Sequence, residues 1–165
     1  MKNKRGIVFF VMGVSGCGKS TIGKGLAQAL TIPFFDGDDY HPKSNIIKMQ
    51  SGKPLNDDDR HDWLVTLNKL AHEHIEKGAV IACSALKESY RALLSTHIEE
   101  HVHWVYLKGS FDEILARLQQ REGHFMPVDL LRSQFETLEP PLMATTVSIN
   151  LSPKDIVDHI LNRPA

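Results

Sequence analysis

The run from Gly13 to Ser20, Gly-Val-Ser-Gly-Cys-Gly-Lys-Ser, limits the possible folds of this chain more than any other segment. It matches the phosphate-binding pattern of a glycine, four residues of any kind, and then Gly-Lys-Ser/Thr. An apolar run, Ile7 to Met12, precedes it as a buried strand would, and Thr21 to Leu30 follows with helical spacing. Strand, loop and helix in this order predict a loop that binds a nucleoside triphosphate through inward-facing backbone N–H groups. The alternative is a glycine-rich turn with an incidental lysine, and the flanking pattern argues against it.

Two side chains of this loop have expected chemical roles. Lys19 should reach the β and γ oxygens of the triphosphate, and the hydroxyl of Ser20 should ligate Mg²⁺. The predicted nucleotide-binding residues are Gly13, Val14, Ser15, Gly16, Cys17, Gly18, Lys19, Ser20 and Thr21.

Short apolar runs recur along the chain and alternate with segments long enough for helices. This alternation predicts an α/β fold with a five-stranded, mostly parallel sheet and helices on both faces, whose ligands bind beyond the carboxyl ends of the strands. A helix is expected around Asp57–Lys77, and its apolar stripe includes Trp63, which we interpret as a core residue. The predicted strands are Ile7–Met12, Pro33–Phe35, Ala79–Cys83, Val102–Leu107 and Thr146–Ile149.

Length, charge and cysteine content restrict the class of protein. A chain of 165 residues suits one domain, residues 1–165. With 19 basic and 20 acidic residues, it has no net field that would attract nucleic acid or an anionic membrane. The apolar run after Met1 to Gly6 is too short for a signal or a membrane span, so we expect a cytosolic protein. Cys17 and Cys83 have no zinc spacing and suggest reduced thiols.

Two carboxylates follow the second predicted strand, in the sequence Asp36-Gly37-Asp38. Beside a phosphate loop, Asp36 could place Mg²⁺ or its water, and Asp38 could orient or deprotonate a hydroxyl group. The alternative is an Asp/Gly turn in which both side chains cap their own backbone. The pair favours phosphoryl transfer to an alcohol.

Several further blocks, in this order, resemble the gluconate kinase (gluconokinase) family of small P-loop kinases. The resemblance covers residues 7 to about 141. The blocks are Asp36-Gly37-Asp38, His41-Pro42, Asn45, Lys48-Met49, Gly52, Pro54-Leu55, Asp57-x-Asp59-Arg60, Cys83-Ser84-Ala85-Leu86-Lys87-x-x-Tyr90-Arg91, Gly123-His124-Phe125-Met126 and Ser133-Gln134-Phe135-Glu136-x-Leu138-Glu139-x-Pro141.

This resemblance implies a P-loop kinase fold with a substrate-binding helical segment at about residues 38–60 and a small lid at about residues 121–128. It implies ATP-dependent phosphorylation of D-gluconate at the 6-hydroxyl, with Mg²⁺, to give 6-phospho-D-gluconate. Members of the family are commonly homodimers.

Gluconate carries a carboxylate at one end and hydroxyl groups along the rest, so its site needs a fixed cation and mixed donors and acceptors. Arg60 is the first candidate for the carboxylate because a guanidinium makes two parallel bonds to it, and the charges from Asp57 to Asp59 could hold Arg60 in place. A surface salt bridge within that acidic cluster is the alternative. For His41, a capped turn before Pro42 is as good an interpretation as substrate contact. The candidate substrate-binding residues are Asp38, His41, Lys48, Arg60, Lys87 and Arg91.

Arg117 and Arg121 lie four residues apart on the amphipathic segment Asp112–Arg121, so they share one helical face. By resemblance to nucleoside-monophosphate and shikimate kinases, Arg117 would stack on adenine and Arg121 would contact the transferring phosphate as a catalytic residue. Two solvated arginines are the alternative.

Two other functions are also compatible with the sequence. One is a related small-molecule kinase for shikimate, a nucleotide or another sugar acid. The other is a nucleotide-binding regulatory module without transfer activity, against which Lys19, Ser20, Asp36 and Asp38 argue.

Overall fold

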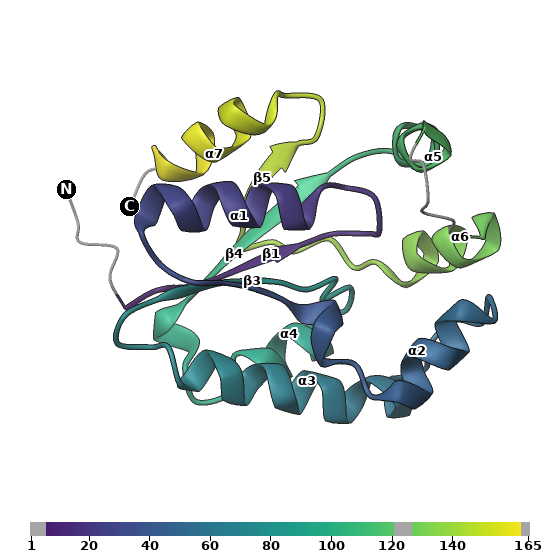
Figure 1. Ribbon diagram of the computed structural model, residues 1–165, viewed down its shortest axis with the longest axis horizontal. Coiled ribbons are helices and arrows are strands. Elements are labelled where there is room, and N and C mark those ends of the chain that lie inside the picture. Colours follow the sequence, from purple (N-terminus) through teal and green to yellow (C-terminus); the bar gives the residue numbers. More distant parts are fainter. Residues whose placement is uncertain (1–5, 121–126, 163–165) are drawn as a thin grey trace.

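Five strands form the central sheet of the computed structural model, which describes residues 6–120 and 127–162 (Figure 1). The strand order is β2-β3-β1-β4-β5, and every neighbouring pair is parallel. The predicted α/β sheet is therefore confirmed, and within the described residues it is parallel throughout. The strands are β1 (Val8–Met12), β2 (Phe34–Asp36), β3 (Ala79–Ala82), β4 (Val102–Lys108) and β5 (Thr145–Ser148).

The central strand β1 explains why the first apolar run has no polar alternation. All five of its residues are buried, and it pairs with β3 on one side and β4 on the other. A strand with neighbours on both sides and helices on both faces meets no water, so an unbroken apolar run suits it.

Helices cover the sheet on both faces, as predicted (Figure 1). Helices α1 (Lys19–Leu30) and α7 (Pro153–Leu161) lie together on one face, and α3 (Asp57–His72) and α4 (Glu88–Leu94) lie together on the other. The α3 helix ends at His72, five residues earlier than the predicted Lys77. Residues 73–77 form turns, and Gly78, with a φ of +90°, then leads into β3.

The elements at the carboxyl edge of the sheet position the site. They are the short 3-10 helix η1 (Gly37–Tyr40) and the helices α2 (Lys43–Gln50), α5 (Phe111–Gln120) and α6 (Val128–Thr137), while the 3-10 helix η2 (Glu99–His101) leads into β4. The expected substrate-binding segment, residues 38–60, runs through η1 and α2 into α3. Arg121 and most of the predicted lid, residues 121–126, lie outside the described residues. No helix in the described ranges is long and apolar enough to cross a membrane.

Candidate active site

The phosphate loop connects β1 to α1 through three glycines with positive φ. The φ angles of Gly13, Gly16 and Gly18 are 148°, 85° and 97°, which other residues adopt only with strain. The ammonium of Lys19 donates to the carbonyl oxygens of Gly13 and Val14, at 3.1 Å each. Lys19 is therefore held against the loop, where a bound phosphate could draw it from these carbonyl groups.

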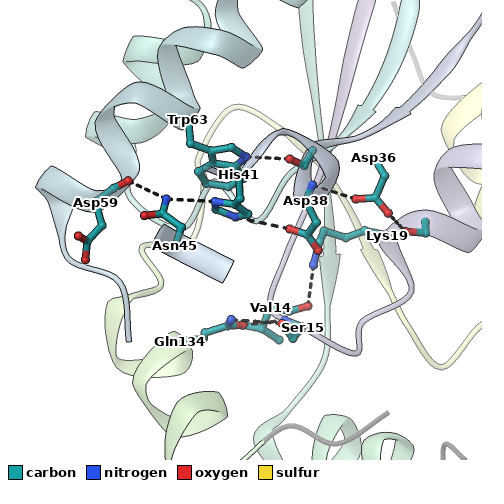
Figure 2. Close-up of polar contacts among 12 residues, drawn as sticks. Val14, Ser15, Lys19, Asp36, Asp38, His41, Asn45, Asp59, Trp63 and Gln134 are labelled. Atoms are coloured by element: carbon teal, nitrogen blue, oxygen red, sulfur yellow. Dashed lines mark hydrogen bonds and ion pairs between the residues drawn. The ribbon is translucent and has the colours of Figure 1, made fainter. Parts of the chain in front are cut away.

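Asp36 joins the phosphate loop to the turn that follows β2 (Figure 2). Its Oδ2 accepts a hydrogen bond from the hydroxyl of Ser20 at 2.9 Å, and its Oδ1 accepts one from the backbone N–H of Asp38 at 3.0 Å. Asp36 thus does cap the backbone of its own turn, as the alternative interpretation supposed. The same carboxylate also contacts Ser20, the predicted metal ligand.

A hydroxyl and a carboxylate at hydrogen-bond distance suit Mg²⁺, which prefers oxygen ligands. Across the part of the chain that is described, no group of three or more His, Cys, Asp and Glu side chains could hold a metal ion. Mg²⁺ commonly binds through one or two protein groups together with nucleotide phosphates and waters, which fits Ser20 and Asp36.

Asp38 projects into a cleft next to the phosphate loop (Figure 2). Its side chain is 74% exposed, but the walls of the cleft displace part of its hydration. This desolvation raises the pKa of Asp38 above its ordinary value, Lys19 opposes the rise, and the charge of Asp36 adds to it. A carboxylate made more basic in this way is better suited to accept a proton.

The cleft around Asp38, which we call the acceptor cavity, has a volume of about 460 Å³ and lies within the usual range for small-molecule sites. The phosphate loop, the segment from η1 to α3, and α6 form its walls. Its lining residues are Ser15, Lys19, Asp38, His41, Ile46, Met49, Gln50, Pro54, Leu55, Arg60, Trp63, Ser84, Pro127, Leu130, Ser133 and Gln134.

Arg60 lines the acceptor cavity and is held by an aromatic side chain. Its Nη1 donates to the Tyr90 hydroxyl at 2.8 Å, and its guanidinium lies 5.2 Å from the centre of the Tyr90 ring. The Tyr90 hydroxyl in turn donates to the carboxylate of Asp57. The expected acidic support for Arg60 therefore acts through Tyr90, whereas Asp59 pairs with Lys48 at 2.6 Å.

Three of the candidate substrate-binding cations do not line the acceptor cavity. Lys48 pairs with Asp59, and Lys87 pairs with Asp57 at 3.2 Å. Arg91 is only 8% exposed, and its guanidinium donates to the carbonyl oxygens of Ala85 at 2.7 Å and Glu139 at 2.8 Å. We assign Arg91 a structural role, because its donors are used in joining two loops.

Trp63 is both a core residue, as predicted, and part of the cavity wall. It is 2% exposed, and its indole N–H donates to the carbonyl oxygen of Gly37 at 2.8 Å. The ring of His41 stacks on it with 4.0 Å between ring centres and 18° between planes. His41 thus lies in the turn before Pro42 and also lines the cavity.

A second cavity, of about 350 Å³, lies beside the outer part of the phosphate loop. Arg117 lines it and donates to the carbonyl oxygen of Ile149. Because the phosphate loop borders both cavities, a nucleotide in this one would direct its phosphates toward the acceptor cavity. The lining residues are Gly16, Cys17, Gly18, Thr21, Ile22, Arg117, Gln120, Ile149, Leu151, Pro153 and Ile156.

Gln134 is a site residue that the sequence did not single out. Its Oε1 accepts from the backbone N–H of Ser15 at 2.7 Å, and its Nε2 donates to the Ser15 hydroxyl at 3.2 Å (Figure 2). The residue lies in one of the family-like blocks, which was the only available signal, because 119 positions separate it from its partner.

Both cysteines are free thiols, and both are buried. Burial raises the pKa of the Cys83 thiol to about 12, so this thiol stays protonated and unreactive near neutral pH.

The fold and the site define a P-loop kinase of small molecules. The defining features are the phosphate loop with Lys19 and Ser20, the carboxylate pair, and a cavity on each side of the loop. The family model described as shikimate kinase matches residues 15–160. The thermosensitive gluconokinase of Escherichia coli (strain K12) is 50% identical over 135 residues, which cover 81% of this chain and 72% of that protein. The gluconokinase of Arabidopsis thaliana is 41% identical over 176 residues, covering 97% and 93%. The chain belongs to the gluconokinase family, which confirms the resemblance carried by its motifs.

Solved structures agree with this assignment. The crystal structure of a gluconokinase from Sinorhizobium meliloti 1021 has a TM-score of 0.87 and 40% identity, covering 94% of this chain and 89% of that one. The APS kinase of Mycobacterium tuberculosis, at a TM-score of 0.73 and 16% identity, covers 96% of both chains and shares the fold.

Proposed function

We propose that the chain transfers the γ-phosphoryl group of ATP to the 6-hydroxyl of D-gluconate, giving 6-phospho-D-gluconate and ADP. The observation that carries the proposal is that Lys19, Asp38 and Arg60 line one cavity at the phosphate loop. That cavity thus combines a phosphate ligand, a proton acceptor and a carboxylate-binding cation, in a chain that is about half identical to a known gluconokinase. These are the groups that an ATP-dependent sugar-acid kinase requires.

The nucleotide half of the site rests on the phosphate loop. The backbone N–H groups of residues 13–20 bind the phosphates, and Lys19 moves from the carbonyl groups of its own loop to the β and γ oxygens. Arg117 lies beside the cavity that would hold the adenine. Ser20 and Asp36 would hold Mg²⁺, which neutralises negative charge on the phosphates when bound.

The acceptor half rests on Asp38 and Arg60. The 6-hydroxyl oxygen attacks the γ-phosphorus, the bond to the β–γ bridging oxygen breaks, and the hydroxyl proton passes to Asp38. Arg60 binds the gluconate carboxylate and so places the opposite end of the molecule at the phosphate loop. Lys48 and Lys87 act indirectly, by holding the carboxylates of Asp59 and Asp57.

The remaining expectations belong to the same proposal and rest on the family resemblance. They are Arg121 as a ligand of the transferring phosphate in a closing lid, Mg²⁺ as the ion bound with ATP, a homodimeric assembly and a cytosolic location.

Phosphorus-31 NMR of the protein with MgATP and gluconate tests the proposal, because it identifies both the activity and the phosphorylated position. We expect a phosphomonoester signal coupled to the C6 protons, together with ADP. Parallel samples with shikimate, a nucleoside monophosphate and another sugar acid serve as controls. Transfer to one of these compounds but not to gluconate would mean that the acceptor is that compound. If no phosphoryl transfer to any acceptor were detected in a single turnover, the nucleotide-binding regulatory module would be favoured.

A further inference from the structure

Asn45 lies buried on α2, between the backbone of α3 and the ring of His41 (Figure 2). The residue is only 3% exposed. Its Nδ2 is 2.8 Å from the carbonyl oxygen of Asp59 and 3.3 Å from Nδ1 of His41. The amide group therefore has two neighbours that restrict its orientation.

These contacts determine which atoms donate. A backbone carbonyl oxygen can only accept, so the amide atom that faces Asp59 must be the NH₂ group. The second hydrogen of this group is directed to Nδ1 of His41, which must then be the unprotonated acceptor. A neutral imidazole with a free Nδ1 carries its proton on Nε2.

The surroundings of His41 keep the ring neutral and fixed. Its side chain is 4% exposed and stacks on Trp63. Burial, with a smaller contribution from the positive charge of Arg60, lowers the pKa of His41 to about 4. Near neutral pH the ring therefore has one N–H group.

The Nε2 atom of His41 faces the candidate base, at 3.8 Å from Oδ1 of Asp38. Resting on the proposed function, we propose that Asn45 fixes His41 as the Nε2–H tautomer, and that this N–H orients Asp38 by holding Oδ1 while Oδ2 stays free for the acceptor hydroxyl. Asn45 and His41 are then positioning residues. A small movement of the exposed Asp38 side chain would bring the donor to hydrogen-bond distance.

This arrangement also decides whether His41 could act as the base in place of Asp38. With Nδ1 facing Asn45 and Nε2 protonated, the neutral ring presents no lone pair to the cavity. His41 therefore cannot take the proton of the acceptor hydroxyl, and Asp38 can.

Nitrogen-15 NMR of the histidine side chains tests the tautomer directly in the protein without substrates. We expect the His41 signals to show a protonated Nε2 and an unprotonated Nδ1 at neutral pH, and the His41→Gln variant assigns them by their loss. In Asn45→Asp, a carboxyl group that keeps its proton toward the carbonyl oxygen of Asp59 presents its other oxygen to His41 as an acceptor, so Nδ1 should become protonated. A His41 ring protonated on Nδ1 in the unmodified protein would overturn the inference whatever the acceptor is.

Kinetics test the orienting role. His41→Gln places an amide donor near the position of Nε2, so its kcat should stay within about 10-fold of that of the unmodified protein. His41→Leu and Asn45→Asp should lower kcat by about 100-fold, with little change in the KM for ATP. The control is Ser44→Ala, at an exposed neighbour on α2. Thermal unfolding checks that both His41 variants are folded. If they are, equal losses of kcat in His41→Gln and His41→Leu would indicate that His41 has only a packing role, and would overturn the inference. Failure of the proposed function would be recognised by a different result: the unmodified protein would release no ADP in response to gluconate.

Discussion

Ser20, in the first turn of α1, donates a hydrogen bond across 2.9 Å to Asp36, the last residue of β2. The bond joins the end of the phosphate loop to the turn that carries Asp38, so the nucleotide half and the acceptor half of the site are directly connected. Both side chains carry oxygen atoms that could ligate Mg²⁺ beside the phosphates, as we propose.

The Ser20–Asp36 pair predicts a specific change in metal dependence. Ser20→Ala removes one ligand and leaves Asp36 unpaired, so we expect a higher Mg²⁺ concentration at half-maximal activity and a lower kcat. The measurement is a Mg²⁺ titration of ADP release at saturating ATP and gluconate. Thr66→Ala, which removes an exposed hydroxyl bonded to a helix carbonyl, is the control and should leave the titration unchanged.

Asp38→Asn removes the proposed proton acceptor but keeps the shape of the side chain. We expect kcat to fall by about 10² to 10⁴-fold, the usual contribution of general base catalysis, while ATP still binds. Steady-state kinetics and nucleotide titration measure the two effects. Asp39→Asn changes the adjacent exposed carboxylate, which does not line the acceptor cavity, and serves as the control. Nearly full activity in Asp38→Asn would show that another group takes the proton.

Arg60→Lys should raise the KM for gluconate by about 10-fold or more, because a hydrogen bond to a charged group contributes roughly 1.5–3 kcal/mol and an ammonium cannot form the paired contact. Tyr90→Phe, which removes the hydroxyl that holds Arg60, should raise the same KM by a smaller factor. Initial rates across a gluconate series measure both. Arg132→Lys, at an exposed arginine on α6, is the matched control. An unchanged KM in Arg60→Lys would assign the carboxylate to a different cation.

Gly37→Ala should destabilise the fold and the site together. A Cβ on Gly37 would lie 2.4 Å from the carbonyl oxygen of Ala82, so the turn after β2 would have to move away from β3. We expect a loss of about 1–3 kcal/mol in the free energy of unfolding, as for other overpacked sites, and a lower kcat because Asp38 shifts. Urea unfolding and kinetics measure the two effects. Gly25→Ala, where the nearest atom is a side-chain methyl of Val157 at 3.2 Å, is the control.

Acidification should destabilise the protein partly through His41. Its pKa is about 4 when folded and near 6.5 when unfolded, so between these values the unfolded state binds the extra proton. The contribution is therefore fully present above pH 6.5, declines as the pH falls toward about 4, and then levels off, for a total of roughly 3 kcal/mol. Denaturant unfolding at a series of pH values should show a flatter acid limb in His41→Gln. Parallel limbs would contradict a buried neutral His41.

The regular elements and the phosphate loop follow from local patterns, so the sequence predicts them well. The apolar run of β1, the glycine spacing at residues 13–18 and the helical period of α1 each depend on neighbours within a few positions. Errors concentrate where local signals weaken, as at the end of α3 beyond His72. There residues 73–77 form turns before Gly78 leads into β3, although their composition would also suit a helix.

By itself, the sequence determined the fold class, the phosphate loop, the Asp36/Asp38 pair and the family, because these depend on residue type and spacing. Only the tertiary structure decided which cations face the acceptor cavity. Arg60 lines the acceptor cavity and donates a hydrogen bond to Tyr90, 30 positions away in the chain. Arg91 instead donates to carbonyl oxygens of loops. The contacts of Gln134 with Ser15 and of Asn45 with His41 and Asp59 likewise came only from packing. The physical reason is that these partners lie on different elements, which the fold packs together at the carboxyl edge of the sheet, and such proximity leaves no local periodicity in the chain.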